Sequence, residues 1–526
     1  MKNNRTFVNI LRQRSSGILL PIFSLPGPHG IGDLGPSALQ FVDFLKAGGQ
    51  SCWQILPIGP VNPLFGNSPY MSPSAFAGSP LLISPELLVV QDLLRPDETE
   101  PPEFSEYCVD YGRAAQHKHK LLTLAWQRFQ CRSDRADLLQ KFIHGHPWCI
   151  DYALFVALKQ RYRDKPWYEW PEDIRQRRPE ALAQAQRALQ DQVDAVVFQQ
   201  HLFFDQWIEL RNYAQIQGIR LVGDLPIYVA LDSSDVWANQ GIFQLDDSGT
   251  PTDVAGVPPD YFSATGQRWG NPLYRWAADE TKTRAQLWDW WEQRLRLNFL
   301  LADTLRIDHF RGFSAYWAVA ATEETAINGR WLPGPGQPFF EEMDRRLGGM
   351  SIIAEDLGLI TPDVALLRDN LGYPGMNILL FAFDGNPRNS YLPYNMEKNS
   401  VVYTGTHDND TAVGWFLNPE VAWESKQRAK RFVNRPDDHA GSFHQELIHL
   451  ALSAPSNLAI LPMQDVLGFG NDCRLNVPGV LAGNWQWRCA GHYINAEVAA
   501  WLHSLTDLFG RLPQALDHQD KDQQDS

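Results

Sequence analysis

The sequence predicts an α/β fold, a (β/α)₈ TIM barrel that carries large inserted subdomains. Eight short apolar segments that suit buried strands recur along the 526 residues, and stretches with helical periodicity separate most of them. Several of these segments stop at an ionisable residue, which is typical of a barrel whose active site lies at the carboxyl ends of its strands. An open doubly wound sheet has a similar periodicity, but it concentrates its ligand residues at one crevice.

The expected strands and helices can be given by their residue ranges. The strands are 18–23, 52–58, 219–225, 304–308, 351–355, 376–383, 401–407 and 458–463. Ionisable residues at strand ends are Asp224, Asp308, Glu355, His407 with Asp408, and Asp465. Helices are expected at 37–47, 286–302, 362–371 and 443–452, and Thr361 is placed to cap the third of them.

Two long interruptions break the barrel pattern, mainly between the second and third strands and after the third strand. We therefore expect residues 1–59 to start the barrel, 60–217 to form an inserted and largely helical subdomain, 218–516 to complete the barrel, and 517–526 to be a disordered polar tail. Residues 228–272 are rich in Gly, Pro, Asp and Ser with scattered aromatic residues. This composition predicts a long functional loop that covers the substrate.

Composition excludes several classes of partner. The chain has 46 Lys and Arg against 61 Asp and Glu, and the net charge of -15 opposes binding to nucleic acid or to an anionic membrane. No apolar stretch approaches the about 18 residues of a membrane-spanning helix, and the six cysteines include no C-x-x-C pair. The N-terminus lacks a signal or transit pattern, so a cytoplasmic location is expected. The 19 Trp, 16 Tyr and 27 Phe suit the apolar faces of sugars, although most of these rings are expected in the core.

The segment Leu305-Arg306-Ile307-Asp308 contains the strongest candidate for a nucleophile. Side chains alternate between the faces of a strand, so Arg306 and Asp308 should both point into the barrel. A guanidinium next to a carboxylate favours the ionised form that a nucleophile needs. The alternative is a buried ion pair that only stabilises the strand, and for an isolated R-x-D pattern this would be the better interpretation.

Glu355 is the candidate for a general acid and base. It follows the apolar strand Ile352-Ile353-Ala354 on the face that points into the barrel, whereas Asp356 should face away or cap the next turn. Repulsion from an ionised Asp308 would raise the pKa of Glu355 and suit it to donate a proton to a departing oxygen. The alternative for Glu355 is a helix-cap or loop carboxylate.

The segment 404–410 places several polar side chains directly after a strand. Its spacing matches no EF-hand or zinc pattern, so hydrogen bonding to sugar hydroxyls is preferred to a metal site. Asp224 also ends a strand, but taken alone it is as compatible with a structural role as with ligand binding. No metal and no cofactor are expected.

Motifs along nearly the whole chain resemble the 4-α-glucanotransferase family, also called amylomaltases or disproportionating enzymes, within the α-amylase clan. The segments that carry the resemblance are 17–21, 29–35, 53–57, 66–70, 74–78, 223–229, 266–272, 306–312, 354–358, 406–411 and 483–485. The resemblance implies that Asp308 is the nucleophile, Glu355 the general acid and base, and Asp408 the stabiliser of the transition state. These roles agree with those inferred from strand parity and charge.

The same resemblance implies a set of substrate-binding residues. Arg306, His309 and His407 would hold the sugar at the bond to be broken, with Asp224 nearby. Residues that would line the glucan groove are Ser68, Tyr70, Gln267 and Trp269, together with Asp384 and Asn476, whose motifs match more loosely. Arg268 replaces the hydrophobic residue usual in the family, which would alter the loop over the donor subsites.

The function expected is transfer of a segment of a 1,4-α-D-glucan to the 4-hydroxyl of an acceptor glucan or glucose. It would use a retaining double displacement through a glucosyl-Asp308 intermediate, which requires that the Asp308 and Glu355 carboxyl groups lie roughly 5 to 5.5 Å apart. Two alternatives share these residues, namely an α-glucan hydrolase and a non-catalytic glucan-binding protein on the same fold. The sequence does not determine the oligomeric state.

Overall fold

Eight parallel strands form the main sheet of this computed structural model, which describes residues 11, 13–259, 263–277, 281–358, 360–436 and 439–513. The strands are β1 (Ser15–Leu19), β2 (Cys52–Gln54), β3 (Arg220–Leu225), β6 (Thr304–Ile307), β9 (Ile352–Ala354), β10 (Gly375–Ile378), β11 (Ser400–Tyr403) and β12 (Leu458–Pro462). Each of the eight predicted segments overlaps one of these strands. Their aliphatic side chains are buried on both faces, as in a parallel sheet covered by helices.

The main sheet curls into a nearly closed barrel. Its strand order is β10-β11-β12-β1-β2-β3-β6-β9, so β9 and β10 are the two edges. These edges meet where the Ala354 N–H donates a hydrogen bond to the Pro374 carbonyl at 2.9 Å. The arrangement confirms the predicted (β/α)₈ barrel. Because the strands are parallel, it also brings the residues that follow β3, β6, β9 and β11 to one end of the barrel.

The predicted helices pack around the barrel as α1 (Pro36–Ala47), α10 (Thr281–Leu301), α12 (Pro362–Asn370) and α15 (Phe443–Ser453). Thr361 is the N-cap residue of α12, but its side chain makes no capping hydrogen bond. Instead its hydroxyl accepts a hydrogen bond from Arg311 Nη1 at 3.2 Å. The predicted N-cap position of Thr361 is therefore confirmed, although its hydroxyl contacts Arg311 and not the helix backbone.

Four predicted strands end at least four residues earlier than expected. The second, placed at 52–58, ends at Gln54, and the seventh, placed at 401–407, ends at Tyr403. The other two continue into turns. The first was placed at 18–23, but β1 ends at Leu19 and Ile22–Ser24 forms a 3₁₀ turn after Pro21, which interrupts regular strand pairing. The sixth was placed at 376–383, but β10 ends at Ile378 and Leu379–Phe381 is again a 3₁₀ turn. An apolar run that continues into a buried turn has the same composition as a strand, so composition alone does not mark the end.

A second, antiparallel sheet corrects the prediction that 228–272 is simply a long loop. This region contains α9 (Ser234–Ala238), β4 (Asp253–Val257) and β5 (Gln267–Pro272), and the sheet order is β5-β4-β7-β8 with β7 (Ala315–Ala320) and β8 (Gly329–Pro333). The partner of β4 is β7, which follows β6 in sequence, so local composition does not reveal the pairing. Tyr261 and Phe262, expected in the covering loop, lie outside the described residues.

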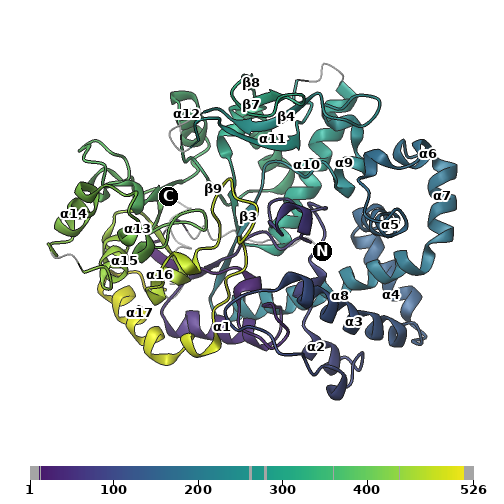
Figure 1. Cartoon of the computed structure of the whole chain (residues 1–526), viewed down its shortest axis with the longest axis horizontal. Coiled ribbons are helices and arrows are strands. Elements are labelled where there is room, and N and C mark those ends of the chain that lie inside the picture. The colour runs from purple at the N-terminus through teal and green to yellow at the C-terminus, as the bar shows by residue number, and fades with distance from the viewer. Residues whose placement is uncertain are drawn as a thin grey trace, which may run out of the picture.

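Helices dominate the region between β2 and β3. They are α2 (Pro85–Val90), α3 (Tyr111–Phe129), α4 (Arg135–Gly145), α5 (Trp148–Arg161), α6 (Glu172–Arg175), α7 (Pro179–Ala188) and α8 (Gln190–Ile216). Figure 1 shows α4 to α7 on one side of the barrel and α13 (Ala412–Leu417), α14 (Trp423–Phe432) and α17 (Ala496–Leu508) on the other. The largest hydrophobic core includes residues of both the barrel and these helices. The predicted tail 517–526 lies outside the described residues.

The described part of the chain contains no helix whose length and hydropathy would allow it to cross a membrane. All six cysteines are free thiols.

Candidate active site

Arg306 links two carboxylates at the end of the barrel. Its Nη1 donates to both carboxylate oxygens of Asp224 at 2.7 Å, and its Nη2 donates to Asp308 Oδ1 at 3.1 Å. The pairing of β3 with β6 puts Asp224 directly opposite Arg306, and strand parity puts Asp308 on the same face. The Arg306 and Asp224 side chains are almost completely buried. The predicted pairing of Arg306 with Asp308 is present, and Asp224 adds a second partner that the sequence did not reveal.

The charge state of Asp308 depends on opposing effects. Burial raises the pKa of Asp308 well above its usual range, and the negative charges of Asp224, Glu355 and Asp408 act in the same direction, whereas Arg306 lowers it. The side chain of Asp308 nevertheless keeps 29% of its surface exposed, so water at its open face offsets part of the effect of burial. Arg306 therefore offsets only part of the effect of burial on the pKa of Asp308.

Glu355 is the second carboxylic acid with a raised pKa in this cluster. It follows β9, and burial raises the pKa of its carboxyl group, partly offset by Arg306 and by two backbone hydrogen bonds. Its Oε2 accepts from the His309 N–H at 2.7 Å and its Oε1 from the Leu357 N–H at 3.2 Å. Asp356 faces away, as predicted, since its carboxylate accepts from the Met376 N–H. The two neighbouring acids therefore have separate partners.

His309 and Trp269 form one wall of the site. The edge of one ring faces the other at a centroid distance of 4.8 Å, and Trp269 Nε1 donates to Gln267 Oε1 at 3.2 Å. Burial lowers the pKa of His309 to about 4, so the imidazole is neutral near pH 7. Its Nε2 is buried and has no hydrogen-bond partner in the described part of the protein. Such an unpaired nitrogen can bind a hydroxyl group of a ligand.

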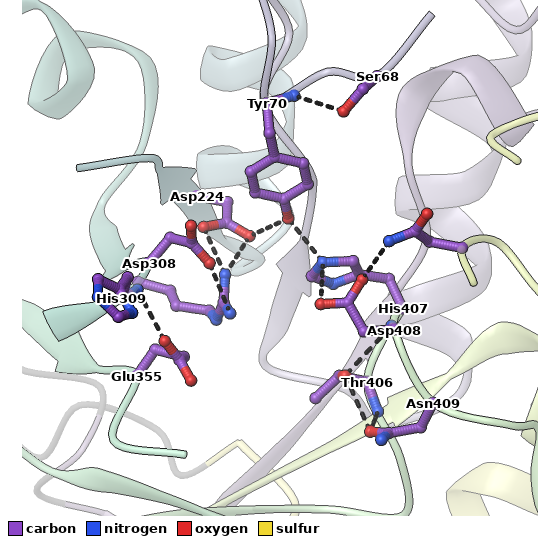
Figure 2. Close-up of polar contacts among 12 residues, drawn as sticks. Ser68, Tyr70, Asp224, Asp308, His309, Glu355, Thr406, His407, Asp408 and Asn409 are labelled. Atoms are coloured by element: carbon purple, nitrogen blue, oxygen red, sulfur yellow. Dashed lines mark hydrogen bonds and ion pairs between the residues drawn. The ribbon is translucent and has the colours of Figure 1, made fainter. Parts of the chain in front are cut away.

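Tyr70 joins the two halves of the site (Figure 2). Its hydroxyl donates to Asp224 Oδ2 at 2.8 Å and lies 2.8 Å from His407 Nε2, which we assign as the donor of the second bond. The ring also stacks on His407, with centroids 5.4 Å apart and planes 16° apart. Ser68 contacts the backbone of Tyr70, because its hydroxyl accepts a hydrogen bond from the Tyr70 N–H at 3.3 Å.

The opposite half of the site contains His407 and Asp408, which follow β11. Figure 2 shows them on one side of Tyr70, with Asp308, His309 and Glu355 on the other. Asp408 Oδ1 accepts from Asn476 Nδ2 at 2.6 Å, and Asp408 Oδ2 lies 3.3 Å from His407 Nε2. Burial lowers the pKa of His407, so this imidazole is also neutral near pH 7. Its Nδ1 is buried without a hydrogen-bond partner among the described residues.

The polar segment after β11 has two separate uses. His407 and Asp408 face the acids, but Asn409 Oδ1 accepts from the Thr406 N–H and hydroxyl at 2.9 Å and so closes a local turn. Asp410 accepts from Arg474 Nη1 at 2.5 Å. Of the polar side chains from His407 to Asp410, only those of His407 and Asp408 therefore face the acids. No group of three or more His, Cys, Asp or Glu side chains in the described ranges is arranged to hold a metal ion.

Three residues singled out from the sequence do not join the acids. Asp384 is exposed, and its carboxylate accepts from the Asn386 N–H at 2.8 Å. Asp465 is buried elsewhere and accepts from the Thr404 hydroxyl at 2.5 Å and the Ala412 N–H at 2.7 Å. Arg268 is exposed on β5, where it donates to the Ala321 carbonyl at 3.0 Å.

Two residues of the site were not predicted. Trp485 packs against Tyr70 and His407, with ring centroids 5.7 and 6.0 Å away, and has a left-handed backbone with φ 63°. Arg474 donates to the Asp408 carbonyl at 2.5 Å as well as to Asp410, and so ties Asp408 to the loop that carries Asn476. For Trp485, the only indication in the sequence was that segment 483–485 is one of those that carry the family resemblance. Arg474 had none, because Asp408 and Asp410 lie more than 60 residues away in the sequence.

The arrangement suits acid and nucleophilic chemistry on a neutral substrate. Asp308 and Glu355 follow adjacent strands, since β6 pairs with β9, and both carboxyl groups have raised pKa values. Asp408 faces them from the far side of Tyr70 (Figure 2). A nucleophilic carboxylate, a carboxylic acid and unpaired neutral imidazoles are the groups needed to cleave a glycosidic bond and to bind the sugar hydroxyls around it.

Comparisons with known proteins are consistent with this chemistry. The family model described as 4-alpha-glucanotransferase matches residues 20–494. The chain is 46% identical to a 4-alpha-glucanotransferase of Synechocystis sp. over 95% of this chain and 99% of the relative, and 43% identical to that of Thermus thermophilus with the same coverage. The solved structure of an amylomaltase from Streptococcus agalactiae in complex with acarbose superposes with a TM-score of 0.91 at 36% identity, covering 95% of this chain and 100% of that one.

Proposed function

Because this chain belongs to the 4-alpha-glucanotransferase family, we propose that it transfers a segment of a 1,4-α-D-glucan to the 4-hydroxyl of an acceptor glucan or glucose. One observation carries the mechanism. Asp308, Glu355 and Asp408 follow three barrel strands at the same end and share a single cluster with Arg306. This cluster supports a retaining double displacement.

Asp308 is the nucleophile in the first step. Its carboxylate forms a bond to the anomeric carbon while the glycosidic bond breaks, and Glu355 donates its proton to the departing oxygen of the leaving glucan. Arg306 stabilises the ionised form of Asp308 through the 3.1 Å contact. The raised pKa of Glu355 favours the protonated form that this step requires.

Glu355 acts as a base in the second step. It takes the proton from the 4-hydroxyl of the acceptor, whose oxygen attacks the anomeric carbon and releases Asp308. Two inversions leave the α configuration unchanged. The prediction that the two carboxyl groups lie roughly 5 to 5.5 Å apart remains part of the proposal.

The remaining site residues bind and position the sugar. Asp408, held by Asn476, stabilises the positive charge that develops at the anomeric centre, and the unpaired nitrogens of His309 and His407 bind sugar hydroxyls. Tyr70 supplies an aromatic face, and Asp224 keeps Arg306 in position. The groove residues Ser68, Gln267, Trp269 and Asp384 extend the site, and for Asp384 the support is the sequence resemblance alone.

Transfer in preference to hydrolysis requires that water be kept from the glucosyl-enzyme. Trp269 on β5 lies next to both His309 and Tyr228, with ring centroids 4.8 and 6.3 Å away. These aromatic side chains form an apolar wall at the point where the intermediate would lie. An acceptor glucan that packs on this wall would displace water and present its 4-hydroxyl. We place the enzyme in the cytoplasm, which its six free thiols support.

The test is incubation with maltotriose. The native protein should produce glucose together with longer maltooligosaccharides, with little change in the total number of reducing ends. Asp308→Asn and Glu355→Gln should each lose at least about 1,000-fold in rate, because each removes a group that makes or breaks bonds. A steady rise in reducing ends would instead indicate a hydrolase. Retention of disproportionation by Asp308→Asn would refute its role as the nucleophile.

A further inference from the structure

His309 has an unusual backbone conformation immediately after Asp308. Its φ of 51° and ψ of 49° lie in the left-handed region. Glycine adopts this region freely and Asn, Asp and His adopt it more often than other residues, whereas a β-branched residue there is a genuine outlier. The turn ends β6 and starts the 3₁₀ turn Phe310–Phe313.

The left-handed turn directs two consecutive N–H groups at one residue. The His309 N–H donates to Glu355 Oε2 at 2.7 Å, and the Phe310 N–H donates to the Glu355 main-chain carbonyl at 3.2 Å. In an extended strand, successive N–H groups point to opposite sides. A helical twist at His309 turns them to the same side, in the manner of the backbone nests that bind anions. The Glu355 N–H in turn donates to the Ile307 carbonyl at 3.1 Å, so hydrogen bonds run in both directions between the two segments.

We propose that His309 is a positioning residue for Glu355, and that its left-handed backbone holds the Glu355 carboxylate beside Asp308 and favours the ionised form of that carboxylate. This inference rests on the proposed role of Glu355 as acid and base. It assigns to the His309 backbone a function separate from that of its imidazole, which faces Trp269. A hydrogen bond from an N–H stabilises the charged carboxylate more than the neutral acid.

Several other charged groups also act on Glu355 and set the background for this effect. Arg306 on β6 favours the ionised form, whereas burial and the neighbouring Asp356 favour the neutral form. Asp308 interacts with Glu355 from β6, and Tyr391 does so from the segment after β10. The Leu357 N–H, at 3.2 Å from Oε1, is the other backbone donor. Of the two backbone bonds to the carboxylate, the one from His309 is the shorter.

The sign of the predicted effect follows from the mechanism. The first step needs a protonated Glu355, so kcat/KM falls at pH values above the pKa of Glu355. Loss of the His309 bond would make the ionised form less stable and would raise that pKa. The fall in activity on the basic side of the pH profile should then occur at higher pH, by about one pH unit.

The experiment compares substitutions that all remove the imidazole but differ in backbone preference. His309→Gly and His309→Asn tolerate the left-handed conformation, whereas His309→Ala and His309→Val disfavour it, most strongly for Val. The pH dependence of kcat/KM is measured with maltotriose for each variant, along with thermal unfolding. We expect the basic limb to stay near its native pH in His309→Gly and His309→Asn and to move upward in His309→Ala and further in His309→Val.

The outcomes separate this inference from the proposed function. If the His309→Val protein does not fold, the pair His309→Gly and His309→Ala, which differ by one methyl group, still decides the question. A basic limb at the same pH in that pair would overturn the role of the His309 backbone. Glu355→Gln tests the other assignment independently, because retention of activity with the native basic limb would show that Glu355 is not the acid.

Discussion

Tyr70 offers the sharpest test of how the two halves of the site are joined. Tyr70→Phe removes one oxygen atom and keeps the ring that stacks on His407. The lost hydroxyl connects Asp224 with His407 at 2.8 Å on each side. Asp224 holds Arg306, and His407 lies next to Asp408. The substitution therefore loosens contacts to both the proposed nucleophile, Asp308, and the proposed stabiliser of the transition state, Asp408.

The magnitude follows from the kinds of bond that are lost. A hydrogen bond to a charged group contributes about 1.5 to 3 kcal/mol and one between neutral groups about 1 kcal/mol. The bond to the Asp224 carboxylate is of the first kind, and the bond with the neutral His407 is of the second. We therefore expect Tyr70→Phe to lower the free energy of unfolding by about 2 to 4 kcal/mol. If half of this loss is expressed in the transition state, kcat/KM falls by about 5- to 30-fold.

Tyr274→Phe is the matched control. Tyr274 is also a buried tyrosine, and its hydroxyl donates to the Ile227 carbonyl at 3.0 Å and accepts from Arg294 at 3.4 Å. It makes no contact with the acids, so it should lose stability with little change in kcat/KM. Urea unfolding and initial rates of glucose release from maltotriose measure the two quantities. Equal losses of kcat/KM in the two variants would refute a specific role for the Tyr70 hydroxyl.

Two further predictions concern Arg474 and Asp465. Arg474→Met releases the Asp408 carbonyl and the Asp410 carboxylate, so kcat should fall at least about tenfold with a smaller change in KM. Arg330→Met is the control, because it breaks only the ion pair with Asp253 in the second sheet and should not change kcat. Equal kcat values for the two variants would contradict the role of Arg474. Burial raises the pKa of Asp465 from 3.8 to about 6. Because the folded-state pKa is raised, the folded protein loses stability as pH rises from about 4 to about 6, by up to about 3 kcal/mol. Asp465→Asn should reduce this dependence in urea unfolding at pH 4 and pH 7, and an unchanged difference between the two pH values would argue against it.

The barrel could be predicted because its signal is local. Val401, Val402 and their counterparts in the other strands are buried on both faces, so each strand is a short continuous apolar run. The β4 and β5 strands gave no such signal, because Gly256, Arg268 and Gly270 interrupt them and because the partner of β4 is the distant β7. Ladders between distant segments depend on the fold that brings them together.

The order of residues already specifies which chemical groups the enzyme uses. The alternation of side chains along a strand puts Arg306 and Asp308 on one face, and an apolar run that ends at Glu355 or His407 delivers that side chain to the end of the barrel. Those relations involve neighbours in the chain. The roles of Asp308 and Glu355 could therefore be proposed from the sequence, whereas the role of Asp408 came from the resemblance to the family.

The tertiary structure alone decides how these groups influence one another. Tyr70, Asp224 and His407 come from segments more than 150 residues apart and meet at one hydroxyl. Burial of the Asp308 carboxylate reverses the expectation that Arg306 would dominate its pKa. The backbone N–H of His309, after β6, donates to the Glu355 carboxylate, which follows the neighbouring strand β9. Electrostatic effects depend on distance and desolvation, and both are set only when the barrel closes around the acids.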